Sequence, residues 1–242
     1  MFLYLVRHGQ SSNNALGDSR ANRVCDPPLT ELGERQAELV GRHLARGIDR
    51  DPAKPYDLEC GGPKSPQGHG ITAIYASPMR RALQTAQAIS RQTGIAPRVS
   101  LDIHEHGGIY LDHGEPRGIV GYPGLKRSEV LSGFPGFELP DGLSEDGWWH
   151  GALESRQDAH ARAVRFLSLM RRRAAETGRI AVVTHAGFTN LFLNAVLGFP
   201  AETRDFFHIS NTGVTLIRFR ADGDVNLRYV NRVEFLPPEM IV

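Results

Sequence analysis

The sequence predicts an α/β protein: a three-layer αβα sandwich around a largely parallel sheet, with an antiparallel hairpin at its C-terminal end. Two observations carry this prediction. Short apolar runs without clean alternation, typical of strands covered on both faces, alternate with segments of helical periodicity. Near the C-terminus, the strand-like runs 214–219 and 225–230 flank an Asp222-Gly223 turn, which is typical of a β-hairpin.

Four apolar runs, rich in Ile, Val and Leu, are expected to form the buried strands: residues 2–6, 71–76, 99–103 and 180–184. Helical segments lie between or after these runs. The first is expected to start at Thr30, an N-cap residue, and the second at Ser77-Pro78, a cap followed by a first-turn proline. Two further helices have apolar faces within 163–174 and 188–196, and the last ends at Gly198.

Length and composition indicate how the chain is organised. The 242 residues are 40% hydrophobic and 23% charged, which suits a globular chain with a sizeable core. The simplest interpretation is a single domain over 1–242. It would carry a loop insertion at about 49–70 and a lid-like insertion at about 107–151, both rich in Gly and Pro.

Several classes of protein are disfavoured by the same composition. A net charge of +1 does not provide the basic surface of a general nucleic-acid binder. No apolar run approaches the ~18 residues that a membrane span requires. The apolar N-terminal stretch is too short for a signal-peptide core, and the two cysteines do not form a disulfide scaffold. We therefore expect a cytoplasmic protein with no membrane or nucleic-acid partner.

Polar and cationic residues follow each of the four predicted strands. They are Arg7-His8-Gly9, Ser77 with Arg80-Arg81, Glu105 and His185. Ligands of open α/β sheets bind outside the carboxyl ends of the strands, so these side chains are expected to share one site. Cations in the first turn of a helix oppose its macrodipole, a cost that a bound anion reverses. For Arg80, which is expected to face the surface, a salt bridge is the simpler interpretation.

Four motifs occur in order along the chain. They are Arg7-His8-Gly9 with Asn14; Pro28-Leu29-Thr30 with Gly33 and Gln36-Ala37; Ser77-Pro78 with Arg81-Ala82 and Thr85; and Thr184-His185-Ala186-Gly187. Together they resemble the histidine phosphatase superfamily, which has the phosphoglycerate-mutase-like fold. The resemblance spans almost the whole chain and aligns the family arginine with Arg81 rather than with Arg80.

The resemblance implies a role for each matching residue. His8 would attack phosphorus and become a phosphohistidine, which requires a neutral imidazole nitrogen. Arg7, Arg81 and His185 would bind the substrate and neutralise its phosphoryl oxygens, and Asn14 would add a neutral donor. Because these groups supply positive charge, no metal and no cofactor is expected.

A carboxyl group is also required, to protonate the leaving oxygen and then to deprotonate water. Glu105 is the first candidate, because it follows a predicted strand and its Glu-x-x-Gly context resembles the family's acid motif. Asp102 and Asp112 are its rivals. For Asp102, contact with the local backbone or a salt bridge is the favoured interpretation.

Two groups of residues leave alternatives open. The histidines His104, His106 and His113, together with Asp112, offer ligands for a metal-dependent hydrolase, although substrate contact or loop packing is favoured. Trp148-Trp149 would either cap the active site or pack the insertion against the core.

The reaction is inferred from two departures from the mutase pattern. Position 10 is glutamine where mutases typically have glutamate, and Thr-His-Ala-Gly replaces Gly-His-Gly-Asn around His185. Both departures resemble the phosphatase branch. We therefore expect a metal-independent phosphomonoesterase acting on a small phosphorylated metabolite. A phosphoglycerate-type mutase or sugar bisphosphatase is the alternative, followed by a catalytically idle module that binds phosphate or a partner.

Overall fold

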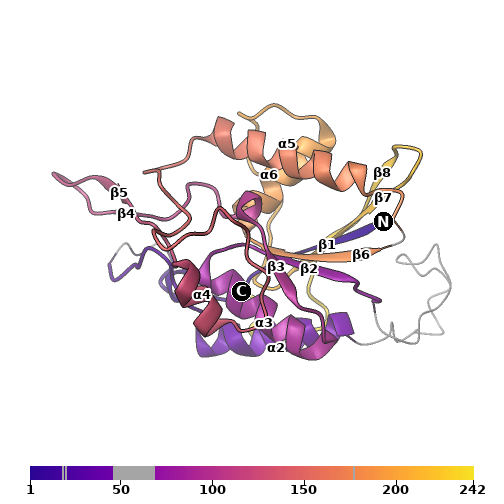
Figure 1. Ribbon diagram of the computed structural model, residues 1–242, viewed down its shortest axis with the longest axis horizontal. Helices are drawn as coiled ribbons and strands as arrows, with labels where there is room; N and C mark the ends of the chain where they lie inside the picture. Colours follow the sequence, from indigo (N-terminus) through magenta and orange to yellow (C-terminus); the bar gives the residue numbers. More distant parts are fainter. Residues whose placement is uncertain (18, 20, 46–68, 177) are drawn as a thin grey trace.

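A six-stranded sheet in the order β3-β2-β6-β1-β7-β8 forms the centre of the computed structural model, which describes residues 1–17, 19, 21–45, 69–176 and 178–242 (Figure 1). Four strands are parallel: β1 (Phe2–Arg7), β2 (Ala73–Ala76), β3 (Pro97–Val99) and β6 (Arg179–Thr184). The strand β7 (Val214–Phe219) is antiparallel to β1 and forms a hairpin with β8 (Val225–Arg232). The predicted mixed sheet is confirmed.

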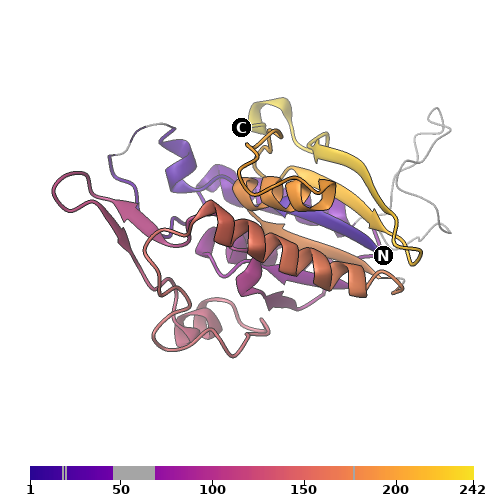
Figure 2. The ribbon, with the colours of Figure 1, turned by 90° about the horizontal axis from the view of Figure 1, so that it is seen from above.

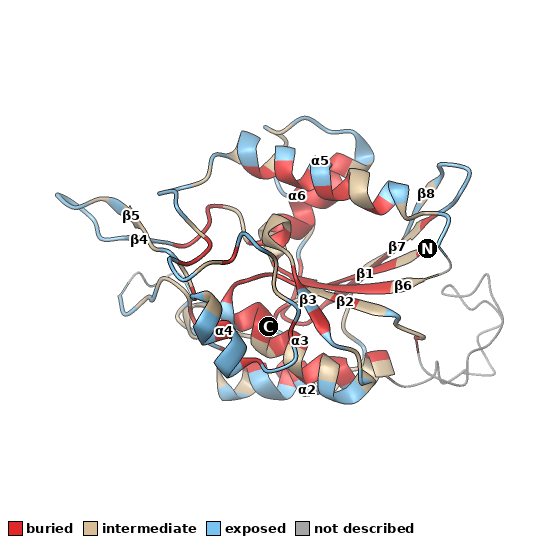
Figure 3. Cartoon of the chain, in the orientation of Figure 1, coloured by how far each residue is buried: buried red, intermediate tan, exposed pale blue. Residues whose placement is uncertain are grey.

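Helices cover both faces of this sheet, which gives the three predicted layers (Figure 1). One face carries α5 (Arg156–Arg172) and α6 (Ala186–Leu197), and the other carries α2 (Glu31–Ala45) and α3 (Arg80–Thr93). Successive strand side chains point to opposite faces. In β1, Leu3 therefore joins the core under α5 and α6, whereas Tyr4 joins the core under α2 and α3. The inner faces of the helices are buried accordingly (Figure 3).

The stretch 107–151 has more regular structure than its sequence predicts. It contains β4 (Tyr110–Asp112), β5 (Ile119–Gly121) and α4 (Arg127–Gly133), and β4 and β5 form a hairpin that projects from the molecule (Figure 2). Trp148 is 6% exposed and belongs to the core cluster under α3, so it packs the insertion against the core. The other predicted insertion, 49–70, lies almost entirely outside the described residues. The division into a single domain with two insertions stays a prediction.

Two predicted element boundaries are wrong. The third strand ends at Val99, not at residue 103, and Leu101–Ile103 form the 3-10 turn η1. The second helix begins at Arg80 with Met79 as its N-cap, so Ser77-Pro78 precedes the helix. Because the Met79 side chain has no oxygen to accept a hydrogen bond, a distant residue takes over this function: the Asp26 carboxylate accepts the Arg80 N–H at 3.1 and 3.2 Å.

The remaining short elements are α1 (Ser12–Ala15) after β1 and the 3-10 turn η2 (Pro238–Met240) near the C-terminus. The fourth predicted helix ends as expected, with Gly198 in the left-handed conformation at φ 74°. Among the helices of the described part of the chain, none has both the length and the apolarity to cross a membrane.

Candidate active site

A pocket of about 690 Å³ lies at the carboxyl edge of the parallel strands, under the β4–β5 hairpin. Its walls include five predicted site residues: Arg7, His8, Asn14, Arg81 and Glu105. His106, and Asp112 and His113 from the insertion, also line the pocket. The pocket is far larger than a phosphate ion, so it has room for the group that carries the phosphate.

His8 follows β1 and is held by both its backbone and its ring. Its N–H donates to the Thr184 carbonyl at 2.9 Å, and its ring Nδ1 lies 2.6 Å from the Gly9 carbonyl oxygen. A carbonyl accepts only, so Nδ1 carries the proton and Nε2 is unprotonated. Burial, followed by the charges of Arg81 and Arg7, lowers the pKa of His8 well below its ordinary value. The imidazole is therefore neutral, as a nucleophile requires.

The loop after His8 fits closely against α2. A Cβ on Gly9 would clash with the Gly33 carbonyl, and a Cβ on Gly33 would clash with the Gln10 carbonyl. The Gly9 N–H donates to Thr85 Oγ1 at 3.1 Å, and the Gln10 N–H donates to Oε1 of the buried Gln36 at 2.8 Å. Glycine at positions 9 and 33 permits this close approach of two backbones, which fixes the loop that carries His8.

Arg81 lies in the first turn of α3 and is 9% exposed. Its Nε donates to His8 Nε2 at 3.1 Å, and its guanidinium lies 3.7 Å from Asp26 Oδ1. The adjacent Arg80 is exposed, so the structure separates the two arginines as predicted. Arg7 is placed by one hydrogen bond, from NH1 to the Ile209 carbonyl at 2.6 Å.

His185 lies behind His8 and is fully buried, so it does not form part of the pocket wall. The two imidazole rings are 5.1 Å apart between centroids, and His185 Nε2 lies 2.7 Å from Ser77 Oγ. Burial, followed by the charge of Arg81, lowers the pKa of His185 well below its ordinary value. Among the described residues, its buried Nδ1 has no hydrogen-bond partner.

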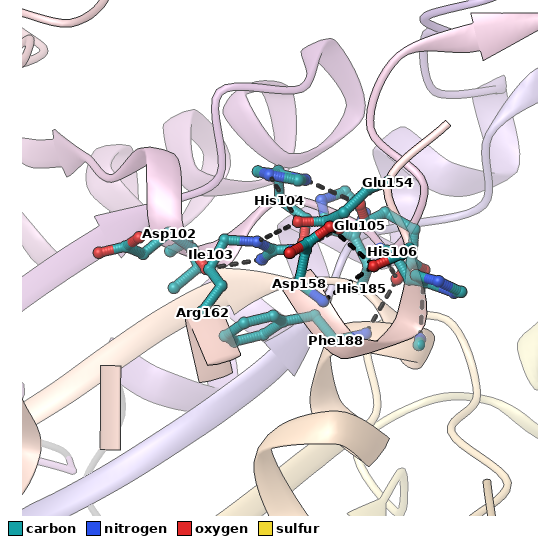
Figure 4. A network of polar contacts seen from close by, with 12 residues as sticks. Asp102, Ile103, His104, Glu105, His106, Glu154, Asp158, Arg162, His185 and Phe188 are labelled. Atoms are coloured by element: carbon teal, nitrogen blue, oxygen red, sulfur yellow. Dashed lines mark hydrogen bonds and ion pairs between the residues drawn. The ribbon is translucent and has the colours of Figure 1, made fainter. Parts of the chain in front are cut away.

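Glu105 follows the 3-10 turn η1 rather than a strand, and its carboxylate reaches the N-terminus of α6 (Figure 4). Three backbone N–H groups donate to it: those of His106 and Phe188 at 2.9 Å and that of Gly187 at 3.2 Å. A carboxylate suits the unpaired N–H groups and positive end of a helix. One edge of the pocket thus has a fixed carboxyl group near His8 and Arg81.

Asn14 is fixed by its side-chain oxygen. The Ser11 N–H, the Ser11 hydroxyl and Asn211 Nδ2 donate to Asn14 Oδ1 at 3.1, 3.0 and 3.3 Å. Asn211 Nδ2 also donates to the His8 carbonyl at 3.0 Å. These bonds place the Asn14 amide in the pocket wall and connect it to the His8 loop.

The rival carboxyl group Asp102 and the histidines considered as metal ligands lie in different places. Asp102 is half-buried and forms an ion pair with Arg165 at 3.4 Å, the interpretation favoured for it. His104 is buried against Trp148, whereas His106 and His113 line the pocket. Within the described ranges, no group of three or more His, Cys, Asp or Glu side chains is arranged to hold a metal ion.

Comparison with known proteins places this geometry in a family. The family model described as "Histidine phosphatase superfamily (branch 1)" matches residues 3–53 and 64–232. The chain belongs to this superfamily. A curated relative, "Probable phosphoglycerate mutase GpmB" of Photorhabdus laumondii, is 26% identical over 219 residues, which cover 90% of this chain and 85% of that protein.

Solved structures support the superfamily fold. A mycobacterial glucosyl-3-phosphoglycerate phosphatase has a TM-score of 0.59 at 22% identity, covering 96% of this chain and 99% of that one. A phosphoserine phosphatase of Entamoeba histolytica, in complex with phosphoserine, has a TM-score of 0.59 at 23% identity, with coverages of 98% and 99%.

Several residues that complete this histidine phosphatase site were not predicted as site residues. They are Asp26, Gln36 and Asn211, described above, and the buried ion pair of Glu154 with Arg162, which lies outside the pocket wall and whose Arg162 NH1 donates to the His104 carbonyl next to Glu105. Two of them carried a signal: Gln36 lies on the apolar face of α2, and Arg162 lies on the apolar face of α5 between Ala159 and Ala163. A polar side chain on such a face requires a buried partner. Asp26 and Asn211 lie in loops, and no periodicity marks them.

Proposed function

We propose that this histidine phosphatase is a metal-independent phosphomonoesterase that acts through a phosphohistidine on His8. One observation carries the proposal: a neutral imidazole whose unprotonated Nε2 accepts a hydrogen bond from Arg81, at a pocket that also holds the Glu105 carboxyl group. A nucleophile, a phosphate-binding cation and a proton donor are the three groups that such a reaction requires.

The first step forms a bond from His8 Nε2 to phosphorus as the ester oxygen departs. Glu105, in its carboxylic acid form, gives its proton to that oxygen, so an alcohol leaves. Arg7 and Arg81 neutralise the phosphoryl oxygens, and we assign Asn14 to the same group of donors. His185, which lies outside the pocket wall, packs against the His8 ring instead of contacting the phosphoryl group. The arginines thus provide charge stabilisation that other phosphoryl-transfer sites obtain from a metal.

The second step returns His8 to its neutral form. Water gives a proton to the Glu105 carboxylate and attacks phosphorus, the P–N bond breaks, and inorganic phosphate leaves. The pocket of about 690 Å³ supports a small phosphorylated metabolite as substrate.

A phosphoglycerate-type mutase is the second candidate, and the name of the relative in P. laumondii favours it. In a mutase the phosphohistidine passes its phosphoryl group to a second hydroxyl instead of to water. Gln10 and the Thr-His-Ala-Gly segment support hydrolysis instead.

Rapid-quench kinetics of the wild type and His8→Ala with an aryl phosphate, in the presence of a chelator, test the proposal. We expect a burst of acid-labile phosphoenzyme followed by free phosphate in the wild type, and neither in the variant. Adding 3-phosphoglycerate as acceptor separates the two candidates. A mutase would transfer the phosphoryl group of the aryl phosphate to this acceptor, whereas a phosphatase would release it as inorganic phosphate. Absence of both phosphoenzyme and turnover in the wild type would overturn the proposal.

A further inference from the structure

Arg162 is a buried cation in α5, with 4% of its surface exposed, and it lies beside the segment that precedes Glu105 (Figure 4). Its Nε and NH2 groups donate to the two carboxylate oxygens of Glu154 at 3.0 and 2.7 Å. Its NH1 group donates to the carbonyls of Asp102 and His104 at 2.7 and 2.9 Å. The guanidinium is thus hydrogen-bonded to a carboxylate on one side and to the backbone on the other.

Those two carbonyls belong to the segment that leads directly into Glu105. The hydroxyl of Thr184 holds the same segment by donating to the Ile103 carbonyl at 2.7 Å. The Arg162 guanidinium also lies 5.2 Å from the centroid of the Phe188 ring, and the Phe188 N–H donates to Glu105. Arg162 therefore contacts both the chain that carries the carboxyl group and a residue that binds it.

Glu154 connects this cluster to the 107–151 insertion. Its side chain is 8% exposed, and its backbone N–H donates to the Gly107 carbonyl at 3.2 Å. This hydrogen bond brings the two ends of the insertion together, two residues after Glu105. A buried ion pair is costly to desolvate, and apolar residues of similar volume often stabilise a fold as well or better. Stability alone is therefore a weak reason for this pair.

We propose that the Glu154–Arg162 pair is a positioning pair that holds Glu105 at the oxygen it protonates. The inference rests on the proposed function, in which Glu105 is the proton donor. Arg162 fixes the backbone before Glu105, and Glu154 orients and neutralises Arg162. Neither residue lines the pocket.

If the pair positions Glu105, the loss of kcat/KM on removing Arg162 should depend on the leaving group of the substrate. An alkoxide must be protonated as it leaves, whereas 4-nitrophenolate leaves without help. The ratio kcat/KM reports the steps up to formation of the phosphoenzyme. We expect Arg162→Met to lower kcat/KM for a primary alkyl phosphate about 10- to 100-fold. For 4-nitrophenyl phosphate we expect the same variant to change kcat/KM by less than about 3-fold. Arg162→Lys, which keeps the charge, should recover part of the loss.

The matched control is Arg165→Met, one turn along α5. Arg165 is exposed and contacts the same segment through the Asp102 side chain. Its replacement should leave kcat/KM for both substrates within about 2-fold of the wild-type value, because an exposed ion pair contributes little. If Arg162→Met fails to fold, the double variant Glu154→Met/Arg162→Met, which removes both buried charges, replaces it.

The outcomes separate the inference from the proposed function. Equal losses on the two substrates, or no loss on the alkyl ester, would overturn the positioning role and leave the phosphatase intact. If the wild type forms no phosphoenzyme, the proposed function fails, and the crystal structure of Arg162→Met decides the positioning claim. A Glu105 carboxylate that has left the Gly187 and Phe188 N–H groups supports the claim, and one that still binds them overturns it.

Discussion

Arg81 Nε donates its hydrogen bond to the His8 nitrogen that we assign as nucleophile, over 3.1 Å. In the free protein, this lone pair is therefore occupied. An arriving phosphoryl group has to accept the Arg81 N–H before Nε2 can attack phosphorus. In the proposed reaction, Arg81 thus holds the ring in place before the substrate binds and stabilises the phosphoryl oxygens afterwards.

The first prediction compares two adjacent arginines. Arg81→Lys keeps the charge but removes the planar fork that reaches His8 and the phosphate together, so we expect kcat to fall by about 10²- to 10³-fold. Arg80→Lys changes an exposed side chain, so its kcat should stay within about 2-fold of the wild-type value. Steady-state hydrolysis of an aryl phosphate provides the measurement. Equal effects of the two substitutions would mean that the family arginine has been assigned to the wrong position.

The second prediction uses Gly187, which lies in the first turn of α6. A Cβ at this position would lie 2.5 Å from Glu105 Oε1, so alanine must displace the carboxylate. We expect Gly187→Ala to lower kcat/KM for an alkyl phosphate about 10-fold or more. Alanine favours helix by up to about 1 kcal/mol, which offsets a similar loss of capping at the start of α6, so the melting temperature should change by only a few degrees.

Combining Gly187→Ala with Glu105→Gln tests whether the alanine lowers activity through the Glu105 carboxyl group. If alanine acts through the carboxyl group, adding it to the Gln variant should have little further effect, because the two changes remove one interaction. Additive losses would assign Gly187 a separate role.

The third prediction concerns stability at acidic pH. Burial lowers the pKa of His104 from 6.5 to about 3. In the unfolded chain this histidine gains its proton near pH 6.5, whereas in the folded chain it stays neutral until about pH 3. The unfolded state therefore binds more protons within this window, and the free energy of unfolding falls as the pH is lowered through it.

Urea denaturation at several pH values between 6.5 and 5 measures this effect. His104→Gln should reduce the slope by up to about 1.4 kcal/mol per pH unit, and the exposed His150→Gln serves as the control. His8 and His185, whose pKa values are also lowered, add to the slope of the wild type in the same direction. An unchanged slope in His104→Gln would contradict the prediction.

Sequence patterns predicted the sheet, its hairpin and four of its helices because burial on two faces and helical periodicity leave strong local signals. They also placed His8 and Arg81 near one another, since strand ends converge, and Glu105 joins them although it follows η1 rather than a strand. Contacts set by distant segments were missed. Asp26 caps α3 in place of Met79, so the helix starts at Arg80. β3 is an edge strand that ends at Val99, and the chain then turns away from the sheet, although residues 99–103 read as one apolar run.

The hydrogen bond from the Glu154 N–H to the Gly107 carbonyl bears on how such a protein diversifies. The segment between these residues starts and ends at one point of the sandwich, and it is also docked on the sheet through Glu138, which pairs with β3. The β4–β5 hairpin inside it projects from the molecule, so the hairpin can change in length and composition while the span between its ends stays constant, and the entropy of closing a longer loop grows only slowly. The hairpin that lines one side of the pocket can thus vary independently of the residues proposed for phosphoryl transfer. Replacing the hairpin would change which substrates bind without altering those residues.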